Sequence, residues 1–509
     1  MIVRGTPQWR GLPRKAVLGC LLTVAGVDAA VAAADPDTLL RAEINRLAER
    51  IEKLEQRNRE LEQRIEADAD TARRLAALET QQAATERALA TDRLSEEEPE
   101  LVTRVKAAEY KVADMQKSAS VIESLDGFSA GASLTTVGQQ LDGGGVDTGV
   151  LLNYRADITV NTPKMATGNI ESSLFGHFRI GQGRGVAEAL PFFVGPNASA
   201  FQLGSVVPPE SSAVILAEAW YQADIPLPLD SPRSLSRQTL TVNFGKMDPF
   251  AFFDQNAAAN DETRQFLASG LVHSALLDNP LAANVGADGF GFSPGVRLAY
   301  LNERNNPRRY GFSVGVFGSG QGADFSESIR SPFVIAQAET RQRFLGLEGN
   351  YRFYYWRNGQ APTFIPNATA THEGFGLSVD QRVGDAIVLF GRYGAASGSD
   401  LPFDRTLSVG AEFGGSYWRR AADMLGLGIG ANRASADFRL QSAGVLDEDG
   451  AALYGYGARG SESYAEVYYR YRIQENFEIT PDLQWIRHPA ANPDIGSVLV
   501  PGLRLQLTY

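Results

Sequence analysis

From Gly127 to the end of the chain, apolar and polar residues alternate with a period of two. In the final segment, residues 503–509, Leu and Tyr hold every odd position, whereas Arg, Gln and Thr hold the even ones. Because successive side chains of a strand point to opposite faces, one face of this strand is apolar and the other is polar. An arginine that faces lipid at mid-bilayer costs about 2–4 kcal/mol, so the polar faces must line a wet interior. The pattern predicts a transmembrane β-barrel; a soluble secreted all-β protein is the alternative.

Fifteen segments share this alternation, and residues 333–338 form a weak sixteenth. The fifteen are 128–136, 149–161, 170–180, 215–225, 239–246, 295–303, 310–318, 345–355, 374–383, 386–394, 406–418, 424–432, 462–472, 477–487 and 498–509. Single-chain bacterial barrels have even strand numbers, so we expect sixteen. The predicted fold class is therefore all-β, a transmembrane antiparallel β-barrel over residues 121–509, preceded by an α-helical coiled-coil segment.

The connections between these segments alternate in length, which predicts the orientation of the barrel. Those at 383–386 and 474–476 are tight, as expected on the periplasmic side. The longer connections are expected outside the cell, and they are 182–210, 248–292, 319–343, 395–405 and 433–461.

Residues 1–34 have the pattern of a secretory signal peptide, with four basic residues, an apolar stretch at 16–27 and three alanines before Asp35. The single cysteine, Cys20, lies in this leader, so the exported chain is expected to have no disulfide. The chain has 48 basic and 60 acidic residues; loss of the leader removes four and one, which leaves a net charge of −15. That charge argues against nucleic acid as a partner.

Residues 40–94 follow a heptad pattern, in which Ile or Leu occupies the core positions and Asn58 replaces one Ile. A shorter helical pattern covers residues 101–115. We expect residues 35–120 to form a periplasmic coiled-coil stalk that makes a homo-oligomer, with peptidoglycan as a further candidate partner. The core composition favours a parallel dimer, but porins are usually trimers, and we favour the trimer. A solvated spacer is the alternative.

The sequence offers no catalytic constellation. The four histidines are scattered without the spacing of metal ligands, and no nucleophile with a base can be assembled for an outer-membrane lipase or protease. The acidic run at 447–449 lacks the full spacing of a calcium loop and is expected to be solvated. We therefore predict a protein that is not an enzyme and has no cofactor, no catalytic residue and no resident metal.

The stretch from 245 to 292 carries more specific information. It contains Gly-Lys-Met-Asp at 245–248, Phe-Phe-Asp-Gln-Asn at 252–256 and Asn-Asp-Glu-Thr-Arg-Gln-Phe-Leu at 260–267. With Thr-Pro-Asp-Leu-Gln-Trp at 480–485 and the final strand, these motifs resemble the carbohydrate-selective porin family (OprB type). The resemblance covers about 245–509 well and 127–244 loosely. It implies a barrel of sixteen strands that passes small sugars, glucose in particular, down their gradient.

Sugar recognition needs aromatic faces for the pyranose ring and charged or amide groups for the hydroxyls. Residues of these types on the polar faces of the segments are the candidate pore-lining residues: Arg155, Asp157, Glu171, Arg179, Glu218, Trp220, Glu348 and Arg352. The candidates for an inward-folded constriction loop are Asp248, Asp254, Asn256, Asp261, Glu262 and Arg264. The competing interpretations are generic lumen charges for the wall residues, and a role in fixing the loop for Asp248 and the run at 260–267.

The predicted function is passive diffusion of small hydrophilic solutes, most of all carbohydrates, across the outer membrane of a Gram-negative bacterium. The partners are then small sugars or similar solutes and the outer-membrane lipid. A general or ion-selective porin, including a phosphate-type anion channel, and a structural tether between outer membrane and cell wall are the alternatives. The mixed wall charges and the overall acidity argue against the anion channel.

Overall fold

The computed structural model describes residues 128–186, 188–201, 211–229, 236–279, 291–305, 308–320 and 329–509. The predicted leader (1–34) and stalk (35–120) lie outside these residues. Within them, no helix combines the length and the apolar character needed to cross a membrane.

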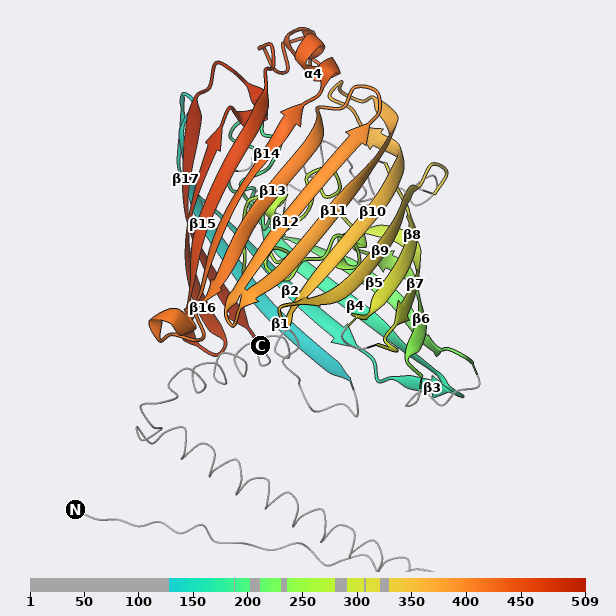
Figure 1. Ribbon diagram of the computed structural model, residues 1–509. Helices are drawn as coiled ribbons and strands as arrows, with labels where there is room; N and C mark the ends of the chain where they lie inside the picture. Colours follow the sequence, from blue (N-terminus) through green and yellow to red (C-terminus); the bar gives the residue numbers. More distant parts are fainter. Residues whose placement is uncertain are drawn as a thin grey trace, which may run out of the picture. The chain divides into compact units, whose positions relative to one another are not determined.

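The described chain is dominated by strands that follow one another around a cylinder (Figure 1). They are β1 (Ser129–Gly143), β2 (Val146–Asn161), β3 (Met165–Thr167), β4 (Ile170–Gln182), β5 (Ala213–Pro226), β6 (Gln238–Met247), β7 (Ser293–Asn302), β8 (Tyr310–Phe317), β9 (Phe333–Phe344), β10 (Leu347–Pro362), β11 (Thr369–Gly384), β12 (Ile387–Ser397), β13 (Phe403–Gly414), β14 (Met424–Ala434), β15 (Ser461–Gln474), β16 (Phe477–Arg487) and β17 (Ser497–Thr508). The helices are short: α3 (Ser269–Val272), α4 (Ala436–Gln441), and the 3-10 helices η1 (Pro249–Ala251), η3 (Gly415–Trp418), η4 (Ser442–Gly444) and η5 (Pro489–Ala491).

Every pairing between neighbouring strands is antiparallel, and β17 pairs with β1 to close the sheet. The last residue takes part in the closure, because the backbone N–H of Tyr509 donates to the Ala132 carbonyl at 2.7 Å and the Tyr509 carbonyl accepts the backbone N–H of Ala132 at 2.9 Å. The three-residue β3 pairs with β4 beside the end of β2, so the closed wall has sixteen strands. The fold class and the strand number expected from the sequence are confirmed.

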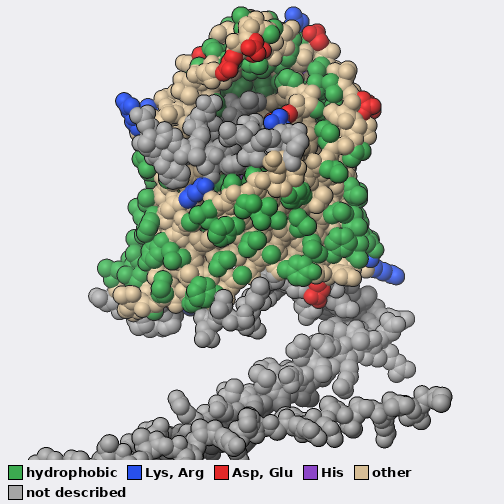
Figure 2. Space-filling model, turned by 180° about the vertical axis from the view of Figure 1, so that it is seen from behind, with side chains coloured by type: hydrophobic (Ala, Val, Ile, Leu, Met, Phe, Trp, Pro, Cys, Tyr) green, Lys and Arg blue, Asp and Glu red, His purple; other side chains and the backbone are tan. Residues whose placement is uncertain are grey.

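The side chains alternate between the two faces of the wall as the sequence predicts. In β13, Leu407 and Val409 are exposed, whereas Thr406 and Ser408, which alternate with them, are 3% and 2% exposed. On the face seen in Figure 2, hydrophobic side chains dominate a broad band and charged ones lie mainly towards the two ends. Such a surface matches the apolar core of a bilayer.

The two ends of the barrel differ. The connections 345–346, 385–386 and 475–476 lie at one end, together with the chain's C-terminus (Figure 1). The long connections, including the one that contains α4, lie at the other end. Since outer-membrane barrels have short periplasmic turns and long extracellular loops, the end with α4 faces outward.

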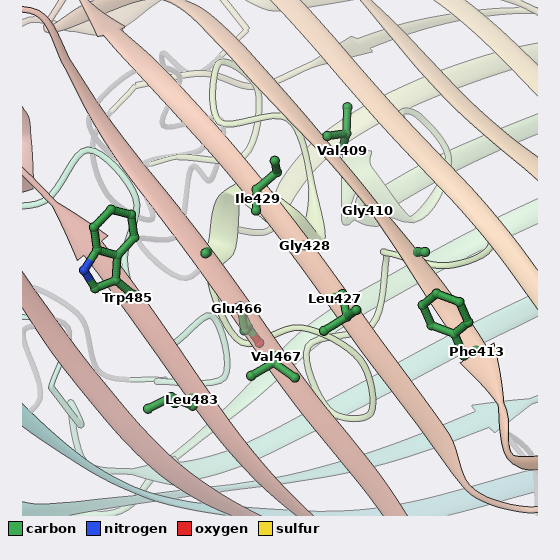
Figure 3. Close-up of a pocket in the computed structure, with 12 residues that line it drawn as sticks. Val409, Gly410, Phe413, Leu427, Gly428, Ile429, Glu466, Val467, Leu483 and Trp485 are labelled. Carbon is green, nitrogen blue, oxygen red and sulfur yellow. The ribbon is translucent and has the colours of Figure 1, made fainter. Parts of the chain in front are cut away.

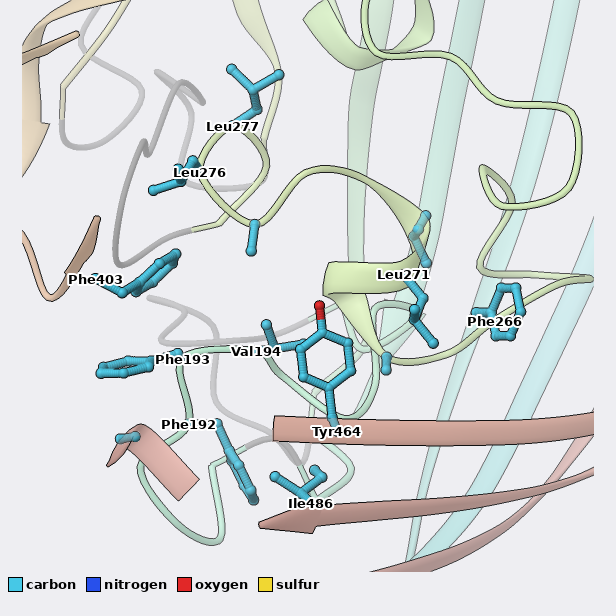
Figure 4. Packing of buried hydrophobic residues seen from close by; sticks show 14 of the residues in the cluster. Phe192, Phe193, Val194, Phe266, Leu271, Leu276, Leu277, Phe403, Tyr464 and Ile486 are labelled. Atoms are coloured by element: carbon cyan, nitrogen blue, oxygen red, sulfur yellow. The ribbon is translucent and has the colours of Figure 1, made fainter. Parts of the chain in front are cut away.

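Two of the long connections fold into the barrel and pack against each other. We call residues 248–279, which follow β6, the inward loop, and residues 183–186 and 188–201, which follow β4, the companion loop. The backbone N–H of Ala198 donates to the Leu267 carbonyl at 2.7 Å, and that of Ser269 donates to Gly195 at 3.0 Å. Figure 4 shows the apolar core that results, in which side chains of both loops meet inward-facing wall residues such as Tyr464 and Ile486.

Small residues on the wall make room for this core. A Cβ added to Gly428 of β14 would lie 2.7 Å from a Leu271 methyl and 3.0 Å from the Phe266 ring. Both of those side chains are fully buried. The inward loop therefore packs so closely against the wall that position 428 has room only for a residue without a side chain.

Candidate pore constriction

Arg392, on the inward face of β12, holds the inward loop at three points along its length. Its guanidinium lies 3.1 Å from the carboxylate of Asp254, and both side chains are 0% exposed. It also donates to three backbone carbonyl groups: Leu271 at 2.9 Å, Asp254 at 3.1 Å and Ala259 at 2.6 Å. Further hydrogen bonds offset much of the cost of burying this ion pair: the three carbonyl groups accept from Arg392, and the Ser274 backbone N–H donates to Asp254 at 2.7 Å. Within the described chain, Arg392 Nε and Asp254 Oδ1 make no hydrogen bond.

Two glutamates of β15 act in the same way on the two loops. Glu466 accepts the backbone N–H groups of Leu267 and Ala268 at 2.6 and 2.8 Å. Four residues earlier, Glu462 accepts those of Phe193 and Val194 at 2.8 and 2.9 Å. Residues four apart on a strand share a face, so both carboxylates point inward. Glu466 satisfies two buried backbone donors that would otherwise be costly, and Glu462 satisfies three, because it also accepts the N–H of Ala490 at 2.7 Å.

The middle of the inward loop is fixed by β16 and β17. Arg264 makes two hydrogen bonds to the carboxylate of Glu478 at 3.2 and 3.1 Å. Arg504 donates to the backbone carbonyls of Glu262 and Gln265 at 2.9 and 2.8 Å. These bonds leave the Glu262 side chain free to point away from this wall.

The side chain of Glu262 reaches a polar cluster on β2 and β4. It accepts from Arg155 at 2.7 Å, and Arg155 also donates to Asp157 at 2.9 Å. Asp157 takes two further bonds, from Arg179 at 2.7 Å and with His177 at 2.8 Å. Asp157 and Arg179 stand directly opposite each other in the β2–β4 register. The cluster thus joins the barrel wall to the tip of the loop.

The cluster continues onto β5 through Glu218. This carboxylate lies 3.2 Å from His177 Nδ1, accepts the indole N–H of Trp220 at 3.1 Å, and accepts the backbone N–H of Asp248 at 3.2 Å. The register between β4 and β5 shifts at this point, so that Ala217 is an extra residue in β5. Such bulges occur where a strand must re-aim a side chain, and here Glu218 is turned towards the start of the inward loop.

The two loop carboxyl groups of this region have different pKa values. Burial and the negative charge of Glu218 raise the pKa of Asp248 to about 7. Burial alone would raise the pKa of Glu262, but the nearby Arg155 and Arg179 outweigh it, so this pKa lies below its ordinary value. The inward loop therefore contributes to the constriction Glu262, which stays charged, and Asp248, which titrates near neutral pH.

An aromatic surface adjoins the charged cluster. The rings of Phe175 and Trp220 stack with centroids 4.7 Å apart, and Phe252 of the inward loop meets Trp220 edge-on at 5.6 Å. We call these three residues, all half-buried, the aromatic face. The guanidinium of Arg297 lies 4.9 Å above the Phe252 ring. Aromatic rings beside charged hydrogen-bonding groups are suited to contact a small polar molecule that also has apolar faces.

The structure brings half of the fourteen predicted site residues together in this region: Arg155, Asp157, Arg179, Glu218, Trp220, Asp248 and Glu262. Others shape the inward loop. Asn256 is 6% exposed and donates to the Val379 carbonyl at 3.0 Å, and Asp261 accepts the Thr263 N–H at 2.9 Å. Asp254 and Arg264 hold the loop to the wall as described above.

Three predicted wall residues lie away from the constriction. Glu171 is 3.4 Å from Lys164 at the short-turn end of the barrel. Glu348, also at that end, pairs with Arg343 at 3.1 Å, and Arg352 pairs with Asp380 of β11 at 2.9 Å.

Several residues of the region were not among the predicted site residues: His177, Phe252, Arg297, Arg392, Glu462 and Glu466. All except Phe252 occupy polar positions in segments whose alternation is evident in the sequence. The parity of the alternation therefore signals that they face the lumen. It does not signal which loop residues they meet.

Among the described residues, no group of three or more His, Cys, Asp or Glu side chains is placed to hold a metal ion. One apolar depression lies on the outside of the wall and is separate from the pore. Figure 3 shows it between β13 and β16, lined by lipid-facing residues such as Leu427, Ile429 and Val467.

The closed barrel, its apolar outer band and its charged interior define an outer-membrane porin, a channel for small solutes. Residues 212–509, more than half of the chain, match the family described as carbohydrate-selective porin, OprB family. The chain belongs to this family, as the sequence motifs predict.

The solved structure of Pseudomonas putida OprB has a similar fold, with a TM-score of 0.59 and 16% sequence identity over 75% of this chain and 94% of that one. Two curated relatives are each described as Porin AaxA. That of Chlamydia pneumoniae is 27% identical over 144 residues, which is 28% of this chain and 30% of the relative. That of Chlamydia abortus is 24% identical over 270 residues, 52% of this chain and 53% of the relative. The matches thus span about a third to a half of these relatives.

Proposed function

We propose that this porin lets small carbohydrates diffuse through a water-filled barrel that the inward loop narrows. The observation that carries the proposal is the aromatic face beside the cluster of Asp157, Arg179 and Glu218. The flat side of a pyranose packs on aromatic rings, while its hydroxyl groups exchange hydrogen bonds with carboxylates and guanidinium groups. Membership of a family named for carbohydrate selectivity supports the same solute class.

The pairing of charges supports a neutral solute over an ion. Arg155 and Arg179 each bond to Asp157, and Arg155 also bonds to Glu262. Because charges of opposite sign alternate over a few ångströms, the field along the pore is small, and neither anions nor cations are strongly favoured. The same groups replace part of a sugar's hydration without holding it tightly, which passive diffusion requires.

The test is single-channel recording of the purified protein in planar bilayers with increasing glucose or maltose. We expect the ionic current to fall as sugar occupies the constriction, and Trp220→Ala to weaken this block about fivefold or more, in line with the loss of one aromatic contact. Trp485→Ala is the matched control, because Trp485 faces lipid and is 40% exposed. Its sugar block should equal that of the unaltered protein.

An ionic current that no sugar reduces, together with a strong reversal potential, would replace this proposal by an ion-selective pore. A bilayer without any current would indicate a structural tether.

We also propose that residues 35–120 form a periplasmic stalk that assembles trimers after residues 1–34 are removed. The heptad pattern supports this organisation. Deletion of 35–120 should reduce the oligomer to a monomeric barrel, measured as the mass of the detergent-solubilised protein by light scattering. A mass per assembly that still corresponds to three chains would rule out this role for the stalk.

A further inference from the structure

The outward faces of β13, β14 and β16 change from apolar to arginine at the same end of the barrel. In β13 the residue beyond Leu407 on this face is Arg405, and in β16 the residue beyond Trp485 is Arg487. In β14 the corresponding residue is Arg433, whose side chain is 47% exposed. This is the extracellular end, since these strand ends adjoin the long connections (Figure 1). We call Arg405, Arg433 and Arg487 the arginine row.

The strand register places these arginines side by side. Arg405 stands directly opposite Arg433, which stands opposite Ser461 of β15. Ser463, two residues further along β15, stands opposite Arg487. Residues directly opposite in an antiparallel pair have their Cβ atoms about 4.5–5.5 Å apart. The side chains of Arg405 and Arg433 therefore leave the sheet from neighbouring positions, and two serine side chains separate them from Arg487.

The row has more positive than negative charge. Asp404, an extra residue where the β13–β14 register shifts, forms a two-bond ion pair with Arg433 at 2.9 and 2.6 Å. On the outward faces of β13 to β16, as far as these are described, Asp404 is the only carboxylate. Arg405 donates to the hydroxyl of Tyr393 at 3.1 Å. Like charges directly opposite each other destabilise a sheet, so this arrangement is suited to an anion from outside the chain.

A nearby position on the same face shows a different arrangement. Arg357 of β10 also follows an outward aromatic residue, Tyr355, but a glutamate, Glu373 of β11, stands opposite it. Glu373 additionally accepts the Tyr355 hydroxyl at 2.8 Å. Arginine and carboxylate are balanced there, which makes Arg357 a matched comparison for the arginine row.

We propose that the arginine row binds the phosphate of a lipid in the leaflet on the long-loop side. The depth of the row in the bilayer matches that of lipid phosphates. The row lies one outward residue beyond the apolar band and Trp485, and the phosphate layer of a bilayer begins where its hydrocarbon ends. The chemistry fits as well, because guanidinium groups match phosphate oxygens in pairs of hydrogen bonds. The cost of exposing arginine falls to nearly nothing at this depth, so the row is stable where a phosphate is present.

The test uses the fluorescence of Trp485, which adjoins the row. The protein carries Trp418→Phe, which leaves Trp485 as the lipid-facing tryptophan of the described chain, and is reconstituted into vesicles of brominated phosphatidylcholine. Bromine quenches Trp485. Unbrominated dioleoyl phosphatidic acid, a phosphate monoester, is then mixed in, and the recovery of fluorescence gives its binding relative to phosphatidylcholine.

Attraction of about 1 kcal/mol per charge and a net row charge of +2 correspond to a preference of about thirtyfold for phosphatidic acid. The triple variant Arg405→Gln, Arg433→Gln, Arg487→Gln should bring the ratio of phosphatidic acid binding to phosphatidylcholine binding close to one. Arg357→Gln should leave this ratio unchanged. A ratio near one in the unaltered row would overturn the proposal. So would a preference that survives the triple substitution, since it would reflect vesicle charge in general. Folding of each variant is checked by its heat-dependent shift in gel electrophoresis.

Discussion

Replacement of Arg392 by methionine should release the inward loop while the barrel remains folded. The side chain is 0% exposed and bonds to the carboxylate of Asp254 and to three backbone carbonyl groups of the loop. Loss of one partner from a buried ion pair costs about 3–5 kcal/mol, because the other charge is left buried and uncompensated. That cost shifts the equilibrium between the docked and the undocked loop roughly 150- to 4000-fold.

The strands of the barrel do not depend on this bond, since Arg392 takes part in the ladder through its backbone. We therefore expect Arg392→Met to keep the heat-dependent gel shift of a folded barrel. Its single-channel conductance should rise and its block by sugar should weaken, because the loop no longer narrows the pore. Protease added from the extracellular side should cut within residues 248–279, which are protected from cleavage as long as the loop is docked.

Two further variants make the test specific. Arg392→Met combined with Asp254→Asn removes both charges, and it should recover part of the lost docking, since replacing both partners costs far less than replacing one. Arg352→Met removes a lumen arginine whose partner, Asp380, lies on the wall, and it should leave protease resistance unchanged. If Arg392→Met has the conductance and the protease resistance of the unaltered protein, the reasoning about this anchor is wrong.

Two other predictions concern the same loop. Because burial and Glu218 raise the pKa of Asp248 to about 7, its carboxyl should lose its proton between pH 6 and 8, and cation selectivity measured from the reversal potential should rise over that range. The free energy of unfolding should fall over the same pH range. A carboxyl whose pKa is raised on folding stabilises the folded state fully below its ordinary pKa near 4, and this contribution is lost as the pH rises through 7. Asp248→Asn should abolish both changes; a pH-dependent selectivity that persists in this variant would refute the assignment. Gly428→Val should displace Leu271 and Phe266 at a cost of about 1–3 kcal/mol, which increased proteolysis of the loop would reveal and unchanged proteolysis would contradict.

The wall of the barrel could be predicted almost completely from the sequence, because each strand has a polar and an apolar face. The weak segment at 333–338 is informative. It corresponds to β9, in which the inward residues Phe333 and Ile335 are 0% exposed. They are apolar because they belong to the core that the inward loop completes, so neither face of this part of the strand is polar. The alternation was faint where the lumen is filled by protein instead of water.

The candidate site could be predicted only in part. Asp157, Arg179 and Glu218 occupy the polar positions of alternating segments, which predicts that they face the lumen. The contacts of the loops could not be predicted, because they join residues far apart in the chain, such as Phe193 and Glu462, which are separated by 269 positions. No local pattern specifies which carboxylate meets which backbone N–H.

The central claim is that the polar faces of the strands line a wet lumen while the apolar faces meet lipid. It is tested most directly by single cysteines at Gln222 on the inner face of β5 and at Phe244 on the outer face of β6, in a chain whose natural Cys20 is replaced. A membrane-impermeant thiol reagent, applied to the reconstituted channel, should react with Gln222→Cys and reduce the current, and should leave Phe244→Cys unmodified. Rapid labelling of Phe244→Cys with an inert Gln222→Cys would contradict the account.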